Sequence, residues 1–169
     1  ITSRPYLEMT LDLMNQLGIS TSWKDNIIKI LPQNKIADKN IIVESDWSSA
    51  SYFYSLVALG EIGTSISLSS YTKDSLQGDS CLIDIYKNFG VETEFNENAI
   101  SLIKTRKISK DDEKSIELDL KNAPDLAQTI AVTCFGLGME CYLTGLHTLK
   151  IKETDRLVAL KNEIEKLRN

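Results

Sequence analysis

The segment ISTSWKDNIIKIL at residues 19–31 decides how the fold is organised, because its pattern returns as VETEFNENAISLI at residues 91–103. Apolar residues coincide in the two copies without a gap, and Asn26 lies over Asn98 where each copy is expected to turn. Apolar alternation on both sides of a polar turn is typical of a β-hairpin. The chain is therefore expected to contain the same hairpin twice.

Each expected hairpin follows an amphipathic helix that ends at a glycine, Gly18 or Gly90, where a left-handed residue can terminate the helix. The apolar stripes are formed by Leu7, Leu11, Met14 and Leu17 in the first helix and by Leu82, Ile85, Tyr86 and Phe89 in the second. A third amphipathic helix, residues 157–167, closes the sequence without a glycine or a hairpin. The chain begins at Ile1 rather than Met, so we expect a piece cut from a longer protein.

A second pattern repeats upstream of the last two amphipathic helices. Two nearly all-apolar helices are expected, and each should be buried almost all round because it lacks a wide polar face. An alternating or short apolar strand is expected before and after each of them. In chain order, the expected strands and helices are residues 40–44, 51–59 and 63–68, and then 115–120, 126–137 and 138–143. The predicted fold class is α/β (α+β), built from strand-helix-strand-helix-strand-strand units.

Composition limits the function classes. The 169 residues are 42% hydrophobic and 25% charged, which is typical of a globular protein, and no uncharged apolar run is long enough to span a membrane. A net charge of -5 argues against a nucleic-acid partner. Cys81, Cys134 and Cys141 form no CxxC pair and His147 is the single histidine, so neither a metal site nor a disulfide framework is expected. Free thiols favour a reducing compartment, most simply the cytoplasm.

Two carboxylates are expected at helix starts. Asp125 follows Pro124, and Glu153 lies in the run KETDR at residues 152–156. One interpretation is structural: Asp125 caps its helix, and the KETDR run is a solvated ion-pair turn. The other is functional: Lys152 and Arg156 at a helix N-terminus bind an anion, and the two carboxylates face one cleft as acid and base. The residues by themselves leave both interpretations open.

Other candidates have simpler explanations. Capping of the second amphipathic helix accounts for QGD at residues 77–79. Tyr6 and Ser3 lie at an ordinary Pro-containing helix start, but they also suit contact with an anionic ligand. Trp23 and Trp47 are expected to pack rather than to form stacking platforms.

Several ordered motifs together resemble the EPSP synthases, the 3-phosphoshikimate 1-carboxyvinyltransferases, over essentially the whole chain. These motifs are SRPYLEMTLDLM (3–14), VESDWSSASYF (43–53), QGD (77–79), APDLAQT (123–129) and LKIKETDRL (149–157). The sequence departs from the family pattern at Ser45, usually Gly, and at Trp47, usually a small residue. Both residues flank the point where the family's chain is expected to cross between two lobes. The local geometry at that point is therefore the feature that these departures call into question.

The resemblance implies a fold of two lobes, each made of units with buried parallel helices inside and sheets outside. Residues 1–40 would finish one lobe, and residues 41–169 would supply one full and one truncated unit of the other. The reaction implied is transfer of the enolpyruvyl group of phosphoenolpyruvate to the 5-hydroxyl of shikimate 3-phosphate, which releases phosphate. No metal or organic cofactor is implied, the substrates are small molecules, and the full-length parent is expected to be a monomer.

The resemblance also implies residue roles. Asp125 would take the 5-hydroxyl proton, and Glu153 would exchange a proton at the methylene carbon of phosphoenolpyruvate. Lys152 would contact shikimate 3-phosphate, and Arg156 the phosphoenolpyruvate carboxylate. Ser3 and Tyr6 would reach the shikimate phosphate from the opposite lobe.

Two alternatives are weighed against this interpretation. The first is an enolpyruvyl transferase acting on UDP-N-acetylglucosamine, although KETDR and APDLAQT look like the shikimate enzyme. The second is a noncatalytic repeat or interaction module, which separation of Asp125 from Glu153 would favour. The fragment by itself is expected to be inactive.

Overall fold

The computed structural model describes residues 4–108 and 115–167, which form a mixed α/β fold. Its α-helices are α1 (Arg4–Gln16), α2 (Trp47–Leu59), α3 (Leu82–Lys87), α4 (Ala127–Leu137) and α5 (Arg156–Lys166). Short 3₁₀ turns precede three of them: η1 (Gly78–Cys81), η2 (Pro124–Leu126) and η3 (His147–Ile151). The expected α/β class is thus confirmed.

The strands in the described residues form three small sheets. They are β1 (Thr21–Lys24), β2 (Ile27–Ile30), β3 (Ser65–Ser69), β4 (Val91–Asn96), β5 (Ala99–Lys104), β6 (Ser115–Asp119) and β7 (Glu140–Thr144). β1 and β2 form a hairpin, β3, β5 and β4 form an antiparallel sheet in that order, and β6 pairs with β7 in parallel.

The repeated helix and hairpin predicted from the sequence are both present, as α1 with β1–β2 and α3 with β4–β5. Gly18 and Gly90 follow their helices with φ values of 90° and 74°, a region that favours glycine. Each hairpin turns through a residue with positive φ, Asp25 in the first and Glu97 in the second. Local sequence therefore specifies both units.

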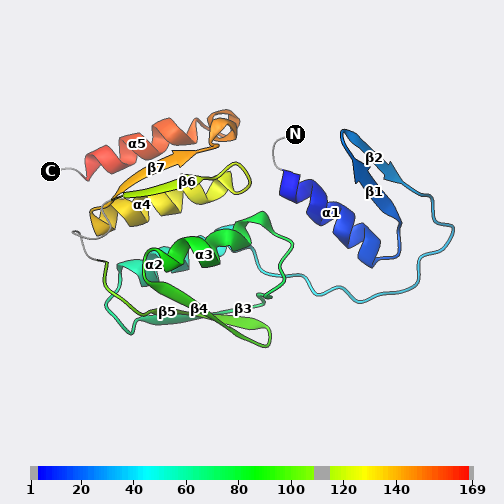
Figure 1. The fold of residues 1–169 in the computed structure, drawn as a ribbon, viewed down its shortest axis with the longest axis horizontal. Coiled ribbons are helices and arrows are strands. Elements are labelled where there is room, and N and C mark those ends of the chain that lie inside the picture. The colour runs from blue at the N-terminus through cyan, green and yellow to red at the C-terminus, as the bar shows by residue number, and fades with distance from the viewer. Residues whose placement is uncertain (1–3, 109–114, 168–169) are drawn as a thin grey trace.

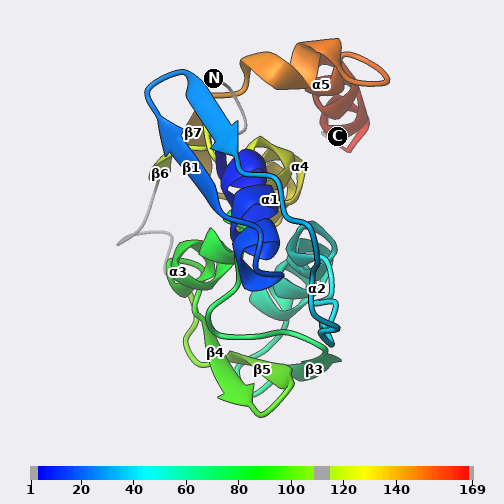
Figure 2. The same ribbon diagram turned by 90° about the vertical axis from the view of Figure 1, so that its right-hand side faces the viewer.

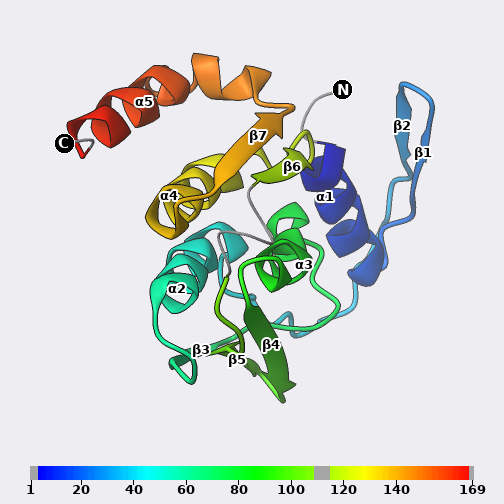
Figure 3. The ribbon, with the colours of Figure 1, turned by 60° about the vertical axis from the view of Figure 1, so that its left-hand side comes forward.

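The core lies where helices α2, α3 and α4 are enclosed between the three-stranded and the two-stranded sheets (Figure 1, Figure 2 and Figure 3). Three of its aromatic rings pack together, with centroid distances of 5.1 Å from Tyr86 to both Tyr54 and Phe89. The Tyr86 hydroxyl lies 3.0 Å from Thr133 Oγ1, which donates to Ser55 Oγ at 2.8 Å. These three buried hydroxyl groups are thus paired with one another.

The prediction that α2 and α4 are buried nearly all round is wrong. On α2, Tyr52, Phe53 and Leu56 are exposed by 64%, 40% and 60%. Val132 and Phe135 are similarly exposed on α4. The reason is that one side of each helix has no packing partner in the described part of the chain, so the apolar residues on that side face outward.

The prediction of a strand at residues 40–44 is also wrong. These residues join β2 to α2 as irregular chain, and Ile42 and Val43 are exposed (Figure 1). Directly after the segment, the amide of Ser45 donates to Ser70 O, just beyond β3, at 2.7 Å. Without a neighbouring strand to pair with, apolar β-branched residues alone do not make a strand. The corresponding expected strand at 115–120 does form, as β6, because β7 lies beside it.

Trp47 packs as predicted, and the structure explains how this departure from the family pattern fits. Its side chain is fully buried, and its ring meets Tyr71 edge-on at a centroid distance of 5.0 Å. Its indole N–H donates to Glu44 Oε1 at 2.9 Å. The large ring therefore forms part of the core, and its polar atom is satisfied.

In the described part of the chain, no helix is long and apolar enough to cross a membrane.

Candidate functional site

Asp125 lies in η2, directly before α4, and its side chain is 22% exposed. Its side chain does not cap the helix, which contradicts the capping interpretation. Instead, Asp125 Oδ1 accepts a hydrogen bond from Arg156 Nη1 at 2.8 Å and lies 3.6 Å from Lys152 Nζ. Both cations come from a segment more than 25 residues further along the chain, so only the tertiary fold assembles this group.

Glu153 lies in the turn between η3 and α5, not on the helix itself. The helix begins at Arg156, and Asp155 caps it by accepting from the amides of Leu157 and Val158 at 3.1 and 3.2 Å. Glu153 Oε2 accepts from Arg156 Nη2 at 2.8 Å, and its side chain is 76% exposed. Its pKa lies below the ordinary value because a backbone amide and then the guanidinium hydrogen-bond to the carboxylate. Glu153 is therefore ionised in this arrangement.

One guanidinium thus joins the two candidate carboxylates. The two separate N–H groups of Arg156 reach Asp125 and Glu153, each at 2.8 Å. An ion-pair turn was expected from Lys152, Asp155 and Arg156, but Asp155 caps α5 and Arg156 pairs with Glu153 and with Asp125 from another element. The arrangement places two acids and two cations within one small region.

Tyr6 comes to this region from α1. Its pKa is raised to about 12 by partial burial and then by the negative charges of Asp79, Asp125 and Asp46. The structure thus brings Tyr6 within electrostatic range of Asp125. Ser3, which the sequence grouped with Tyr6, lies outside the described residues.

Sequence reasoning missed the role of QGD, because capping does not account for it. Neither Gln77 nor its neighbours cap η1 or α3 with a side chain. Asp79 is instead only 2% exposed, and its Oδ2 accepts a hydrogen bond from Ser48 Oγ at the start of α2. One sequence signal for this contact was available. QGD and the motif that contains Ser48 are far apart in sequence, yet both belong to the motifs that resemble the family.

Gln77 holds the connection that leads into α2. Its side-chain oxygen accepts from Trp47 N at 2.9 Å, and its Nε2 donates to Ser45 O at 2.8 Å. Glu44 Oε2 accepts from Ser75 Oγ at 2.6 Å. Burial would raise the pKa of Glu44, but hydrogen bonds from Ser75, Thr72 and Trp47 outweigh it and hold that pKa below its ordinary value. The two family departures, Ser45 and Trp47, are therefore bound into one polar network.

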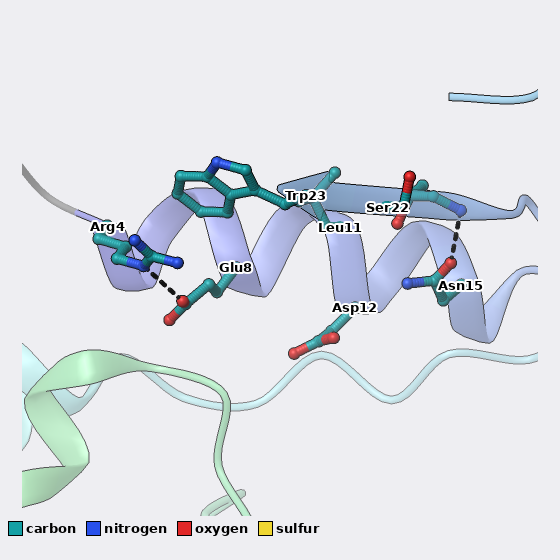
Figure 4. Close-up of a pocket in the computed structure, with 8 residues that line it drawn as sticks. Arg4, Glu8, Leu11, Asp12, Asn15, Ser22 and Trp23 are labelled. Atoms are coloured by element: carbon teal, nitrogen blue, oxygen red, sulfur yellow. Dashed lines mark hydrogen bonds and ion pairs between the residues drawn. The ribbon is translucent and has the colours of Figure 1, made fainter. Parts of the chain in front are cut away.

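A hollow lies between α1 and β1, away from Asp125, and Figure 4 shows its lining. Arg4 donates to Glu8 at 2.9 Å, and its guanidinium lies 4.3 Å from the centroid of the Trp23 ring. Trp23 thus contacts a cation of its own chain, in addition to the packing predicted for it. The charges lining this hollow at Arg4 and Glu8 are already paired with each other.

The chemistry available at the Asp125 region is acid–base catalysis combined with anion binding. Arg156 presents the planar fork that suits a carboxylate or phosphate, and Lys152 adds a second positive charge. Asp125 is partly buried, whereas Glu153 is exposed, so their environments differ in the way that divided acid and base roles require. Among residues 4–108 and 115–167, no cluster of three or more His, Cys, Asp or Glu side chains could hold a metal ion.

The chain is similar to known proteins over nearly its full length. The family model described as EPSP synthase (3-phosphoshikimate 1-carboxyvinyltransferase) matches residues 1–168. A 3-phosphoshikimate 1-carboxyvinyltransferase of Bacteroides fragilis is 43% identical over 168 residues, 99% of this chain and 40% of the relative. Proteins of the same name from Methanocaldococcus jannaschii and Buchnera aphidicola are 34% and 33% identical, over 99% of this chain and 37% of each relative. The chain thus spans about 40% of the length of the curated relatives it matches.

Proposed function

Since the chain belongs to the EPSP synthase family, we propose that it is part of an enzyme that transfers the enolpyruvyl group of phosphoenolpyruvate to the 5-hydroxyl of shikimate 3-phosphate. The observation that carries this proposal is the guanidinium of Arg156, which binds Asp125 and Glu153 together beside Lys152. Both proposed substrates are anions, and a site for them needs cations as well as an acid and a base. The family match favours shikimate 3-phosphate over UDP-N-acetylglucosamine as the acceptor.

In the proposed reaction, Asp125 removes the proton of the 5-hydroxyl group while the oxygen of that hydroxyl attacks C2 of phosphoenolpyruvate. A proton is added to the methylene carbon, which gives a tetrahedral adduct. Loss of a proton from the resulting methyl group and departure of phosphate then restore the double bond. We assign both proton transfers at carbon to Glu153, the more exposed acid.

Arg156 supports this division because its two hydrogen bonds differ. The bond to Glu153 is an exposed contact within one turn, whereas the bond to Asp125 is partly buried. Exposed ion pairs are weak, so the carboxylate of phosphoenolpyruvate would displace Glu153 and keep Asp125 in place. Release from Arg156 would allow the pKa of Glu153 to rise toward its ordinary value, which suits a group that must gain and lose a proton.

We assign Lys152 to shikimate 3-phosphate, with Tyr6 and Ser3 at its phosphate. Tyr6 supports this because it reaches the Asp125 region from the N-terminal unit. In the same proposal, residues 1–40 complete one lobe, and residues 41–169 form part of a second lobe with helices inside and sheets outside. The irregular segment between β2 and α2 would then be the crossing between lobes. We further propose a cytoplasmic monomer.

The test is phosphate release by the complete gene product from phosphoenolpyruvate, with shikimate 3-phosphate as acceptor. Asp125→Ala and Glu153→Ala should each lower kcat at least about 100-fold, the usual size of a general acid or base contribution. Glu163→Ala, at an exposed glutamate of α5 paired with Lys166, is the matched control and should leave kcat unchanged. Turnover with UDP-N-acetylglucosamine in place of shikimate 3-phosphate would contradict the proposed acceptor. Full activity in both site variants would remove the assigned roles.

A further inference from the structure

Asp79 is the buried acid that the proposed reaction leaves unused. It is 2% exposed, and its Oδ1 has no hydrogen-bond partner among the residues that the structure describes. Its other oxygen, Oδ2, is bonded to Ser48 Oγ. An ionised carboxylate with an unpaired buried oxygen is costly, so the protein must offset the charge or remove it.

The surroundings of Asp79 carry more negative than positive charge. Asp46 caps α2, Asp125 lies in η2, and Tyr6 approaches from α1. Lys152 is the cation that favours the charged form of Asp79, but it lies 3.6 Å from Asp125 and is shared with that residue. Burial, followed by the charges of Asp125 and Asp46, raises the pKa of Asp79, while Ser48 and Lys152 oppose the rise. Cys81, on the same turn, also lies within electrostatic range.

Asp79 also lies where three elements meet. A Cβ atom at the preceding residue, Gly78, would lie 2.8 Å from Asn122 O and 3.0 Å from Pro5 Cβ. Only glycine allows such a close approach of the backbone. The turn that carries Asp79 is therefore pressed against the start of α1 and the segment leading to Asp125, while Asp79 itself holds the start of α2.

We propose that Asp79 is a positioning residue, a buried carboxyl that ties the N-terminal turn of α2, through Ser48, to the turns that carry Tyr6 and Asp125. The catalytic part of this inference rests on the proposed function, whereas the buried position of the carboxyl can be tested without it.

The first experiment compares variants of the complete gene product at pH 7. Asp79→Asn preserves shape and an oxygen that can accept from Ser48, so kcat/KM should remain within about threefold of the unmodified protein, whereas Asp79→Ala should lower it at least about tenfold. Asp84→Asn, at an exposed aspartate of α3, is the matched control and should change nothing. Equal loss in Asp79→Asn and Asp79→Ala would overturn the role given to the hydrogen bond with Ser48, and no loss in either would overturn the positioning role.

The second experiment measures thermal unfolding of the 169-residue chain and of its Asp79→Asn variant from pH 4 to pH 8. Because burial raises the pKa of Asp79 in the folded chain, the stability linked to its proton is present below the unfolded value of about 3.9 and is lost as pH rises through the folded value. The unmodified chain should therefore lose stability relative to the variant as pH rises, because only the unmodified chain must bury a charged carboxylate. A difference between the two proteins that does not change with pH would overturn the buried position given to Asp79. Absence of transferase activity in the unmodified protein would refute the proposed function and leave this measurement valid.

Discussion

The guanidinium of Arg156 hydrogen-bonds Asp125 and Glu153 at the same time, with a distance of 2.8 Å to each carboxylate. The two acids come from different elements, separated by α4, β7 and η3. Arg156 therefore fixes the relative positions of the two proposed catalytic groups, and it is also the group proposed to receive the phosphoenolpyruvate carboxylate. This double role makes it the most sensitive cation of the site.

Replacing Arg156 by Lys should show whether the hydrogen-bonding geometry of the guanidinium, and not only its positive charge, is needed. A lysine keeps the positive charge but cannot donate two parallel hydrogen bonds in a fixed plane. In the complete protein, we expect the KM for phosphoenolpyruvate to rise at least about tenfold. Steady-state kinetics with each substrate varied in turn would measure this, with Lys161→Arg on the exposed face of α5 as the control. An unchanged KM would show that a point charge is enough.

Lys104 should be essential for stability rather than for activity. It is 3% exposed, and its Nζ donates to Ala58 O near the end of α2 and to Phe89 O just beyond α3, at 2.7 Å each. Burial and then Arg106 lower its pKa. Lys104→Met would leave two buried carbonyl oxygens unpaired, and we expect the free energy of unfolding to fall by about 3 kcal/mol.

Urea denaturation of the 169-residue chain would measure this loss. Lys107→Met, at an exposed lysine, should change the free energy of unfolding by less than about 0.5 kcal/mol. Equal effects of the two substitutions would contradict the role given to the buried ammonium group.

Cys141 should be the most reactive thiol. Its hydrogen bond with Cys134 lowers its pKa to about 7, against an opposing effect of burial, and its side chain is only partly buried. The same hydrogen bond and burial raise the pKa of Cys134, and burial raises the pKa of Cys81 to about 11. Because the thiolate is the reacting form, alkylation of Cys141 should accelerate as pH rises through about 7 and then level off.

Iodoacetamide labelling of the folded chain between pH 6 and 9, followed by peptide mass spectrometry, would measure this order. Cys141→Ser should remove the fast-labelled fraction, and Cys81→Ser should leave it. Preferential labelling of Cys81 would show that the contact between Cys134 and Cys141 does not control reactivity.

The outward apolar side of α2 should make the isolated chain self-associate. Tyr52, Leu56 and Leu59 lie on one side of α2 because they recur at helical spacing, and their side chains are 64%, 60% and 44% exposed. At one end of this side, Leu59 lies beside Gly136 of α4. Leu56→Lys should lower ANS fluorescence and the apparent size in light scattering. Its unfolding free energy should change by less than about 0.5 kcal/mol, because the side chain is largely exposed. Val43→Lys, at a residue 84% exposed in the irregular segment, is a control outside this face, and an equal effect there would contradict the prediction.

The sequence by itself determined the two helix-and-hairpin units, the buried Trp47 and the family, because helix and strand periods, turn residues and ordered motifs are local properties of the chain. Tertiary structure decided the rest. Residues 40–44 carry a strand-like pattern but find no partner strand, and α2 and α4 each keep one apolar side that no described segment covers. Likewise, no local pattern could show that Arg156 joins Asp125 to Glu153, or that Asp79 is buried against Ser48. Burial and charge pairing depend on which distant segments pack together, and that choice belongs to the folded chain as a whole.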